Sequence, residues 1–144
     1  MHAQHFIQSI DLRKSDTTQA HDEVTLWADF LADTDRAILH SIFLHNIQIR
    51  TLAASGQTAA DTLRKRIRRL LQRISSIEFQ FIARNLAVLP PPTRAIAQLC
   101  ILQGRSISEA ASELRLAPNY VRQLRRLALP ILYSLLTSIT SGGA

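Results

Sequence analysis

The sequence predicts an all-α protein, built as a small helical bundle. Apolar residues recur at spacings of three and four along nearly the whole chain, and no segment alternates apolar and polar residues between turn signals as a strand would. The 144 residues include only four glycines and five prolines, so few positions interrupt a helix. Hydrophobic residues make up 47% of the chain and charged residues 19%, a balance typical of a globular domain.

The N-terminal third predicts three helices. Residues 6–12 carry a weak pattern for a short one. Residues 18–31 form the second, with Trp27 on its apolar side and acidic residues near its start, where the helix dipole favours negative charge. The third begins after Asp33 or Thr34, either of which is a good N-cap, and runs to about residue 45.

The middle of the chain predicts a long basic helix. A short helix over residues 47–54 and a turn at 55–57 precede it, and it extends over residues 58–86. Its apolar stripe consists of Leu63, Ile67, Leu70, Leu71 and Ile74, and its other faces carry Arg64, Lys65, Arg66, Arg68, Arg69 and Arg73. A run of prolines at 90–92 then breaks the chain, because a residue before proline avoids the α conformation.

The C-terminal half predicts four shorter helices, over residues 93–102, 106–114, 118–129 and 130–139. Ser106 or Ser108 caps the second of these, and Glu109 follows Ser106 at the spacing of a capping box. Pro118 suits the first turn of the third helix. The last helix is apolar around most of its girth, so it needs cover from the acidic N-terminal segment or from a second subunit in a homodimer, and the sequence leaves both open.

Composition and breaks divide the chain into four segments. These are an acidic N-terminal helical segment (1–32), a first helical unit with the long basic helix (33–88), a second unit (89–130), and an apolar C-terminal helix with its tail (131–144). A shift of 58 residues aligns the first unit with the second, so that Arg36 falls on Arg94 and Arg64 on Arg122. Either the upstream unit is a diverged repeat, or helices rich in alanine and leucine match by chance.

The charge distribution favours a polyanionic partner. The net charge is +6, but residues 1–35 hold seven acidic and two basic side chains, whereas residues 36–144 hold fifteen basic and four acidic ones. Most of the basic residues are arginines, whose planar guanidinium suits phosphates and guanine edges. Nucleic acid is therefore the leading partner class, against the alternative of a generically basic surface.

The segment Ser106 to Arg126, SISEAASELRLAPNYVRQLRR, has the pattern of two helices that cross closely at small residues. Ala110, Ala111, Leu114, Leu116, Val121 and Leu124 supply the wedge between them. This segment resembles the helix-turn-helix of the fourth conserved region of bacterial sigma factors, and related response-regulator modules. The lead-in LPPPTRAI, from residue 89, is similar to the proline-marked start of that region. The resemblance runs to about residue 131 and implies a bacterial, cytoplasmic protein that binds double-stranded DNA.

The exposed side of the helix predicted over residues 118–129 is the expected contact surface for DNA. The resemblance places Asn119, Tyr120, Arg122, Gln123 and Arg126 at base edges and phosphates in the major groove, with Arg122 and Gln123 as the leading base readers. Arg115 occupies the turn where the family usually has glycine, and is expected to touch phosphate. The alternative is an ordinary corner of two helices with solvated arginines.

The upstream unit keeps only part of this pattern. Gly56, Thr58 and Arg66 stand where Leu114, Leu116 and Leu124 supply the wedge downstream. Two interpretations stay open. The long helix is a second DNA reader that presents Thr62, Arg64, Lys65 and Arg68, or it is a cationic scaffold that binds phosphate without sequence choice, as Arg69 is expected to do.

Other chemistry finds no support in the sequence. One cysteine, Cys100, excludes an internal disulfide framework and suggests a reducing cytoplasm. We expect no enzyme activity, metal, cofactor, signal peptide or membrane span, because the chain has no glycine-rich phosphate loop, no supported histidine pair and no long apolar run.

These patterns predict a sequence-specific DNA-binding transcriptional regulator. One alternative is a sigma-like interaction protein that binds RNA polymerase or another regulator, and another is a nonspecific nucleic-acid-binding protein. Because one helix-turn-helix buries little surface, specific binding would require tandem units or a homodimer.

Overall fold

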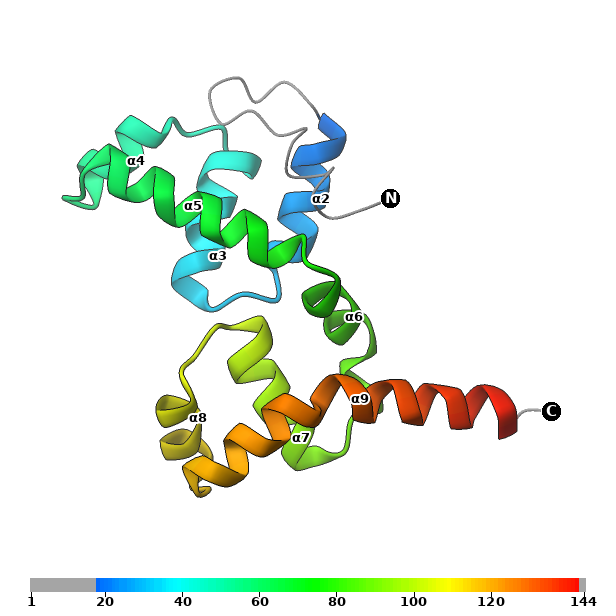
Figure 1. Ribbon diagram of the computed structural model, residues 1–144. Coiled ribbons are helices and arrows are strands. Elements are labelled where there is room, and N and C mark those ends of the chain that lie inside the picture. Colours follow the sequence, from blue (N-terminus) through cyan, green and yellow to red (C-terminus); the bar gives the residue numbers. More distant parts are fainter. Residues whose placement is uncertain (1–17, 143–144) are drawn as a thin grey trace. The chain divides into compact units, whose positions relative to one another are not determined.

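The computed structural model describes residues 18–142 and confirms the all-α prediction, since this part of the chain forms helices and no strand (Figure 1). The chain divides into two compact units, Met1–Ile77 and Glu78–Ala144. Each unit has buried apolar residues of its own. The short helix predicted over residues 6–12 lies outside the described residues.

The first unit contains α2(Thr18–Ala28), α3(Asp33–Leu39), a π-helical turn η1(His40–Leu44), α4(Ile49–Ser55) and α5(Ala60–Ile74). Val24 and Trp27 of α2, Phe43 of η1 and Ile67 of α5 are all buried. Helix α2 ends three residues before the predicted boundary at residue 31, and the predicted third helix is α3 continued by the wider turn η1. The amphipathic stripe of α5 buries all five of its predicted apolar residues, which explains why this very basic helix packs.

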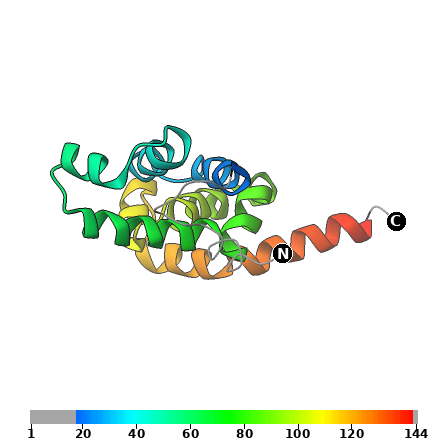
Figure 2. The same ribbon diagram turned by 90° about the horizontal axis from the view of Figure 1, so that it is seen from above.

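The second unit contains α6(Ile77–Asn85), a 3₁₀ turn η2(Leu86–Val88), α7(Pro91–Ile96), a π-helical turn η3(Ala97–Leu102), α8(Ile107–Leu114) and α9(Pro118–Gly142). Phe79 and Ile82 of α6, Leu89 and Leu132 are almost completely buried. The C-terminal part of α9 continues beyond the other helices of its own unit (Figure 2). There Tyr133 stacks on Phe81 with ring centroids 4.6 Å apart, yet it remains 51% exposed.

The single helix predicted over residues 58–86 is wrong. Helix α5 ends at Ile74 and α6 starts at Ile77, because two serines stop the helix. The hydroxyl of Ser75 donates to the carbonyl of Leu71 at 2.7 Å, and that of Ser76 donates to the carbonyl of Arg73 at 2.9 Å. Serine side chains that bond to nearby backbone in this way compete with continuation of the helix.

The predicted break before Pro130 is also wrong, since α9 runs without interruption through this residue. Proline lacks the N–H that would donate to the carbonyl four residues earlier, and its ring crowds that carbonyl. Pro130 lies on the exposed side of α9, where water can satisfy the freed carbonyl. The following turn is anchored by buried Leu132 and by the stacking of Tyr133, so packing keeps the helix continuous.

The two units repeat the same backbone at a shift of 58 residues. The order of helix, π-helical turn, helix and helix from α3 to α5 recurs from α7 to α9. Both π-helical turns end on matching bonds, from the N–H of His45 to the carbonyl of His40 at 2.9 Å and from Gln103 to Gln98 at 3.0 Å. The left-handed residues correspond as well, Asn46 (φ 57°) with Gly104 (φ 74°) and Gln57 (φ 55°) with Arg115 (φ 58°).

Candidate nucleic-acid interface

Helices α8 and α9 are joined by a short turn and contribute small buried residues to one apolar cluster. Ala110, Ala111 and Val121 are buried together with Ile96, Leu99 and Cys100 in one apolar cluster. Ile107, Leu114, Leu116 and Leu124 pack against this cluster, so the residues that the sequence assigns to the wedge lie in one place. Alanine side chains allow two helix backbones to approach closely, and this fixes the crossing.

A capping box fixes the start of α8. Of the two serines proposed as caps, Ser106 is the N-cap, and its hydroxyl accepts a hydrogen bond from the N–H of Glu109 at 3.0 Å. The Glu109 carboxylate accepts one from the N–H of Ser106 at 3.0 Å. The bond from the Ser106 N–H to this carboxylate is the largest cause of a lowered pKa of Glu109, and the Ser106 side chain beside the carboxylate lowers it further. The carboxylate therefore stays ionised at the end of the helix whose dipole favours negative charge.

Arg115 forms the turn between the two helices in a left-handed conformation, with φ 58° and ψ 44°. The N–H of Leu116 then donates to the carbonyl of Ala111 at 3.0 Å, which closes the turn. A side chain in this conformation costs about 1 kcal/mol relative to glycine. An arginine here keeps the turn tight and adds an exposed cation beside the start of α9.

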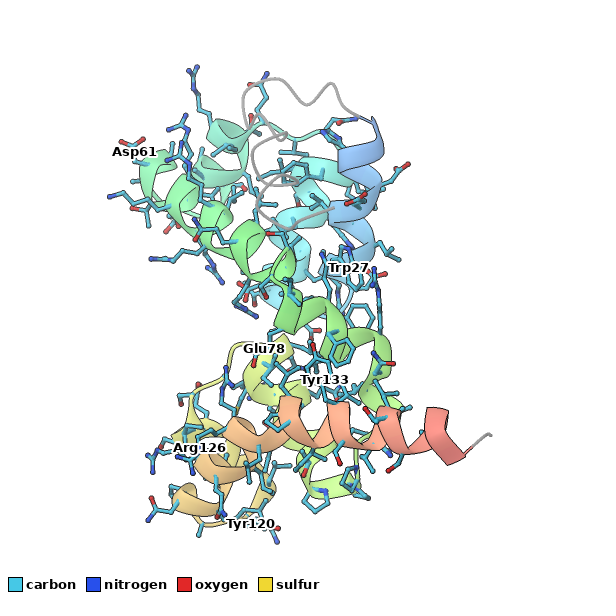
Figure 3. The ribbon with its side chains drawn as sticks, turned by 45° about the vertical axis from the view of Figure 1, so that its right-hand side comes forward. Trp27, Asp61, Glu78, Tyr120, Arg126 and Tyr133 are labelled. Atoms are coloured by element: carbon cyan, nitrogen blue, oxygen red, sulfur yellow. The ribbon has the colours of Figure 1, made fainter. Side chains whose placement is uncertain are left out.

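The outward side of α9 carries a row of polar and cationic side chains at spacings of three and four, Asn119, Arg122, Gln123 and Arg126, all exposed. This row lies opposite Val121, which is fully buried. Nη1 of Arg122 donates to Oδ1 of Asn119 at 2.6 Å, so one guanidinium is already held in place. Tyr120 is 43% exposed beside the row, and Figure 3 shows it near the start of α9 with Arg126 further along.

Two other arginines of the second unit face carboxylates of that unit. Arg105 pairs with Glu113 at 2.9 Å, and Arg125 approaches Glu78 at 3.6 Å. Among the described residues, Gln123, Arg126 and Arg115 have no ion pair or hydrogen bond of their side chains. The outer side of α9 and the turn before it thus carry Arg122, Arg126 and Arg115 without a carboxylate partner, while Arg94 on α7 donates to the carbonyls of Leu89 and Ala87.

In the first unit, the predicted contact residues lie on the outward side of α5. Thr62, Lys65, Arg68 and Arg69 are exposed, and Arg64 is partly buried. Nη1 of Arg64 pairs with Oδ1 of Asp61 at 2.8 Å, and Figure 3 shows Asp61 at the beginning of this helix. The structure thus places the eleven predicted contact residues in two sets, one in each unit, with six in the second and five in the first.

An ion pair that sequence reasoning missed closes the first unit. Nη2 of Arg66 on α5 bonds to Oδ1 of Asp35 on α3 at 2.7 Å. Arg66 stands where the second unit has the partly buried Leu124. The two residues lie 31 positions apart, so no local spacing in the sequence marks the pair. At this wedge position, Arg66 is therefore held by its ion pair with Asp35, whereas Leu124 is held by apolar contact.

Other sites are not evident in the part of the chain that the structure describes. Residues 18–142 contain no group of three or more His, Cys, Asp or Glu side chains placed to hold a metal ion. Among the described helices, none combines the length and the hydrophobicity that crossing a membrane requires. The single Cys100 is buried, and this burial raises the pKa of its thiol.

The sequence matches no known protein family, and neither the curated proteins nor the solved structures contain a match to it.

Proposed function

We propose that this chain is a sequence-specific DNA-binding transcriptional regulator that inserts the N-terminal half of α9 into the major groove of duplex DNA. The observation that supports this most is the exposed row on α9, held outward by a helix-turn-helix whose inner side is sealed by Ala110, Ala111 and Val121. A major groove about 12 Å wide admits one α-helix with side chains of this kind. The resemblance to sigma region 4 points to the same surface.

The side chains of the row fit distinct roles. A guanidinium donates two hydrogen bonds to O6 and N7 of guanine, and a glutamine amide pairs with N6 and N7 of adenine. Arg122, oriented by Asn119, and Gln123 are therefore the base readers. Arg126 and Arg115 are exposed cations near the ends of the contact and bind phosphates, which positions the helix without choosing a sequence.

Selection of bound duplexes from a random pool, with the full chain, tests this function. An enriched motif is expected, and Gln123→Ala should lose preference at one or two positions within it. Gln98→Ala is the matched control, since Gln98 is an exposed glutamine of the same unit that lies outside the row. A pool that shows no enrichment, or equal effects of the two variants, contradicts the proposal.

A second candidate is a sigma-like protein that binds RNA polymerase or another regulator. It is favoured by the apolar residues left exposed on the C-terminal half of α9, with Tyr133 51% and Ile139 62% exposed. Gel filtration of the chain with purified bacterial RNA polymerase, without DNA, separates this candidate from the first. Co-elution that Tyr133→Ala abolishes and Arg122→Ala does not change would favour it.

A further inference from the structure

We infer that residues 33–74 form a second helix-turn-helix, and that α5 reads a DNA half-site of its own, different in sequence from the half-site read by α9. This inference rests on the proposed function for its class of ligand, which is duplex DNA. Of the two interpretations that the sequence leaves open for the long basic helix, a second DNA reader and a cationic scaffold, the inference is the second reader.

The turn between α4 and α5 has the bonds of the turn between α8 and α9. The N–H of Thr58 donates to the carbonyl of Ala53 at 2.9 Å, as Leu116 does to Ala111 at 3.0 Å. Gln57 takes the left-handed conformation, with φ 55°, at the position that corresponds to Arg115. A backbone repeated to this level presents the helix that follows with the same side outward.

The packing behind α5 repeats part of that behind α9, since Gly56 and Thr58, at the positions of Leu114 and Leu116, are exposed and add nothing to it. Ala53 and Leu63 are buried at the positions of Ala111 and Val121. At the position of Leu124, Arg66 reaches Oδ1 of Asp35 with Nε at 3.2 Å and Nη2 at 2.7 Å. The apolar wedge residue is thus replaced by a bond between α5 and α3, and the sequence departure at this position leaves the unit closed.

The outward row of α5 repeats that of α9 with different chemistry. The i, i+3 pair of Arg64 with Asp61 at 2.8 Å stands where Arg122 bonds to Asn119 at 2.6 Å. Lys65 and Arg68 stand where Gln123 and Arg126 do, since each position differs by the same 58 residues. Because the side chains differ, the two rows select different bases.

Asp61 argues for a reader over a phosphate-binding scaffold. A carboxylate on the outward side of a helix that only binds phosphates weakens the attraction to them, and its place in the first turn of α5 accounts for it only through the helix dipole. In a groove, by contrast, a carboxylate accepts from N4 of cytosine, and here it also holds Arg64 in a fixed position. Lys65 and Arg68 are exposed and have no ion pair among the described residues.

Methylation protection of guanine N7 tests the inference, because this atom lies in the major groove. The full chain is bound to a duplex taken from the random-pool selection. We expect two separate groups of protected guanines, of which Lys65→Ala with Arg68→Ala erases one and Arg122→Ala weakens the other. Arg84→Ala, an exposed arginine of α6, controls for loss of charge and should leave both groups in place. A single protected group that the α5 double variant leaves unchanged overturns the inference.

A second pair of variants tests the position of α5 without removing a cation. Asp61→Asn makes the α5 pair resemble the Asn119 pair and should weaken binding to the selected duplex about threefold, because the carboxylate that accepts from cytosine N4 is lost, whereas on a phosphate-binding scaffold it would strengthen binding to all duplexes by withdrawing a like charge. Asp33→Asn is the matched control, since Asp33 also forms an exposed i, i+3 pair, with Arg36 at 2.7 Å, in the first turn of a helix of the same unit. Equal effects of the two substitutions contradict the inference, provided that thermal melting shows both variants folded.

The outcomes separate this inference from the proposed function. If Arg122→Ala leaves its guanines protected while the α5 double variant removes the others, the assignment of α9 fails and that of α5 stands. If the α5 double variant weakens all duplexes equally and removes no group of protected guanines, α5 is a scaffold and only the proposed function survives. Absence of any binding to duplex DNA overturns both.

Discussion

Arg66 on α5 and Asp35 on α3 form a short ion pair where the other unit of the same chain packs a leucine against its core. The distance between Nη2 and Oδ1 is 2.7 Å, and the Asp35 side chain is only 15% exposed. In the second unit the corresponding residues are Leu124, which is partly buried, and Thr93, which is buried. The two units therefore close the same helical arrangement by different interactions.

Exchanging this pair for the residues of the second unit should be nearly neutral. Arg66→Leu alone removes the hydrogen-bonded partner of the Asp35 carboxylate, which keeps only the charge of Arg73 nearby, and should lower the free energy of unfolding of the first unit by about 1–2 kcal/mol. Asp35→Thr with Arg66→Leu removes both charges and should recover most of this loss. Urea unfolding followed by the fluorescence of Trp27, the single tryptophan, measures this unit. A double variant less stable than Arg66→Leu would contradict the account.

Arg122 and Arg69 should differ in what they contribute to binding. Arg122→Ala should weaken binding to the selected site by about 1–3 kcal/mol, through loss of a base contact, and random duplex much less. Arg69→Ala should weaken both duplexes equally and lower the slope of log K against log salt by about 1. Fluorescence anisotropy over a salt series measures both effects. Equal losses on the two duplexes for Arg122→Ala would remove its role in base reading.

The capping box should make the stability of the second unit depend on pH. Ser106→Ala should cost about 1 kcal/mol at neutral pH, because the N–H of Glu109 loses its acceptor. The pKa of Glu109 is lowered in the folded chain, so its contribution is present above the ordinary glutamate pKa of about 4.3 and is lost as the pH falls through the lower folded value. Glu109→Gln should therefore differ from the parent at pH 7 and approach it as the pH falls through the folded pKa of Glu109.

The buried thiol of Cys100 gives a readout for these capping variants. It is the only cysteine, it is 8% exposed, and burial raises its pKa, so thiol reagents should modify it only when the second unit opens. The labelling rate in urea should rise for Ser106→Ala, while the fluorescence of Trp27 in the first unit keeps its transition. Rapid labelling of the folded parent would show that this readout does not report opening.

Arg115→Gly should separate stability from binding. Glycine adopts the left-handed conformation of this turn without a steric cost, so the second unit should gain up to about 1 kcal/mol after the larger chain entropy of glycine is subtracted. The same substitution removes the phosphate contact that we propose for Arg115 and should weaken binding to all duplexes by a similar factor. Thermal melting and anisotropy give the two results. Lower stability would indicate that the arginine side chain supports the turn.

Local patterns predicted most of the fold. The apolar stripe of α5, the capping box of Ser106 and Glu109, and the wedge around Ala111 each depend on residues a few positions apart, and the structure has all of them. The outward placement of Arg122 and Gln123 follows from the same periodicity, since both lie on the side of the helix away from the buried Val121.

What could not be predicted depends on contacts distant in sequence. A proline inside a helix usually breaks it, but here buried Leu132 and stacked Tyr133 hold the turn that follows Pro130. The pair of Asp35 with Arg66 joins residues in different helices, and no local spacing marks it. Helix α5 ends at Ile74 because the hydroxyl of Ser75 bonds to the backbone, and no periodicity in the sequence signals such a bond.

The unbroken course of α9 through Pro130 carries the C-terminal end of this helix far from its start. At about 1.5 Å per residue its 25 residues span roughly 37 Å, so Ile139 is about 30 Å from Asn119 along the axis. A fluorophore attached near Ile139 is therefore carried well clear of the reading end. The anisotropy of this fluorophore would report a change in the orientation of α9 when the chain binds the DNA that we propose as its ligand, and the label would not disturb the residues at the start of the helix.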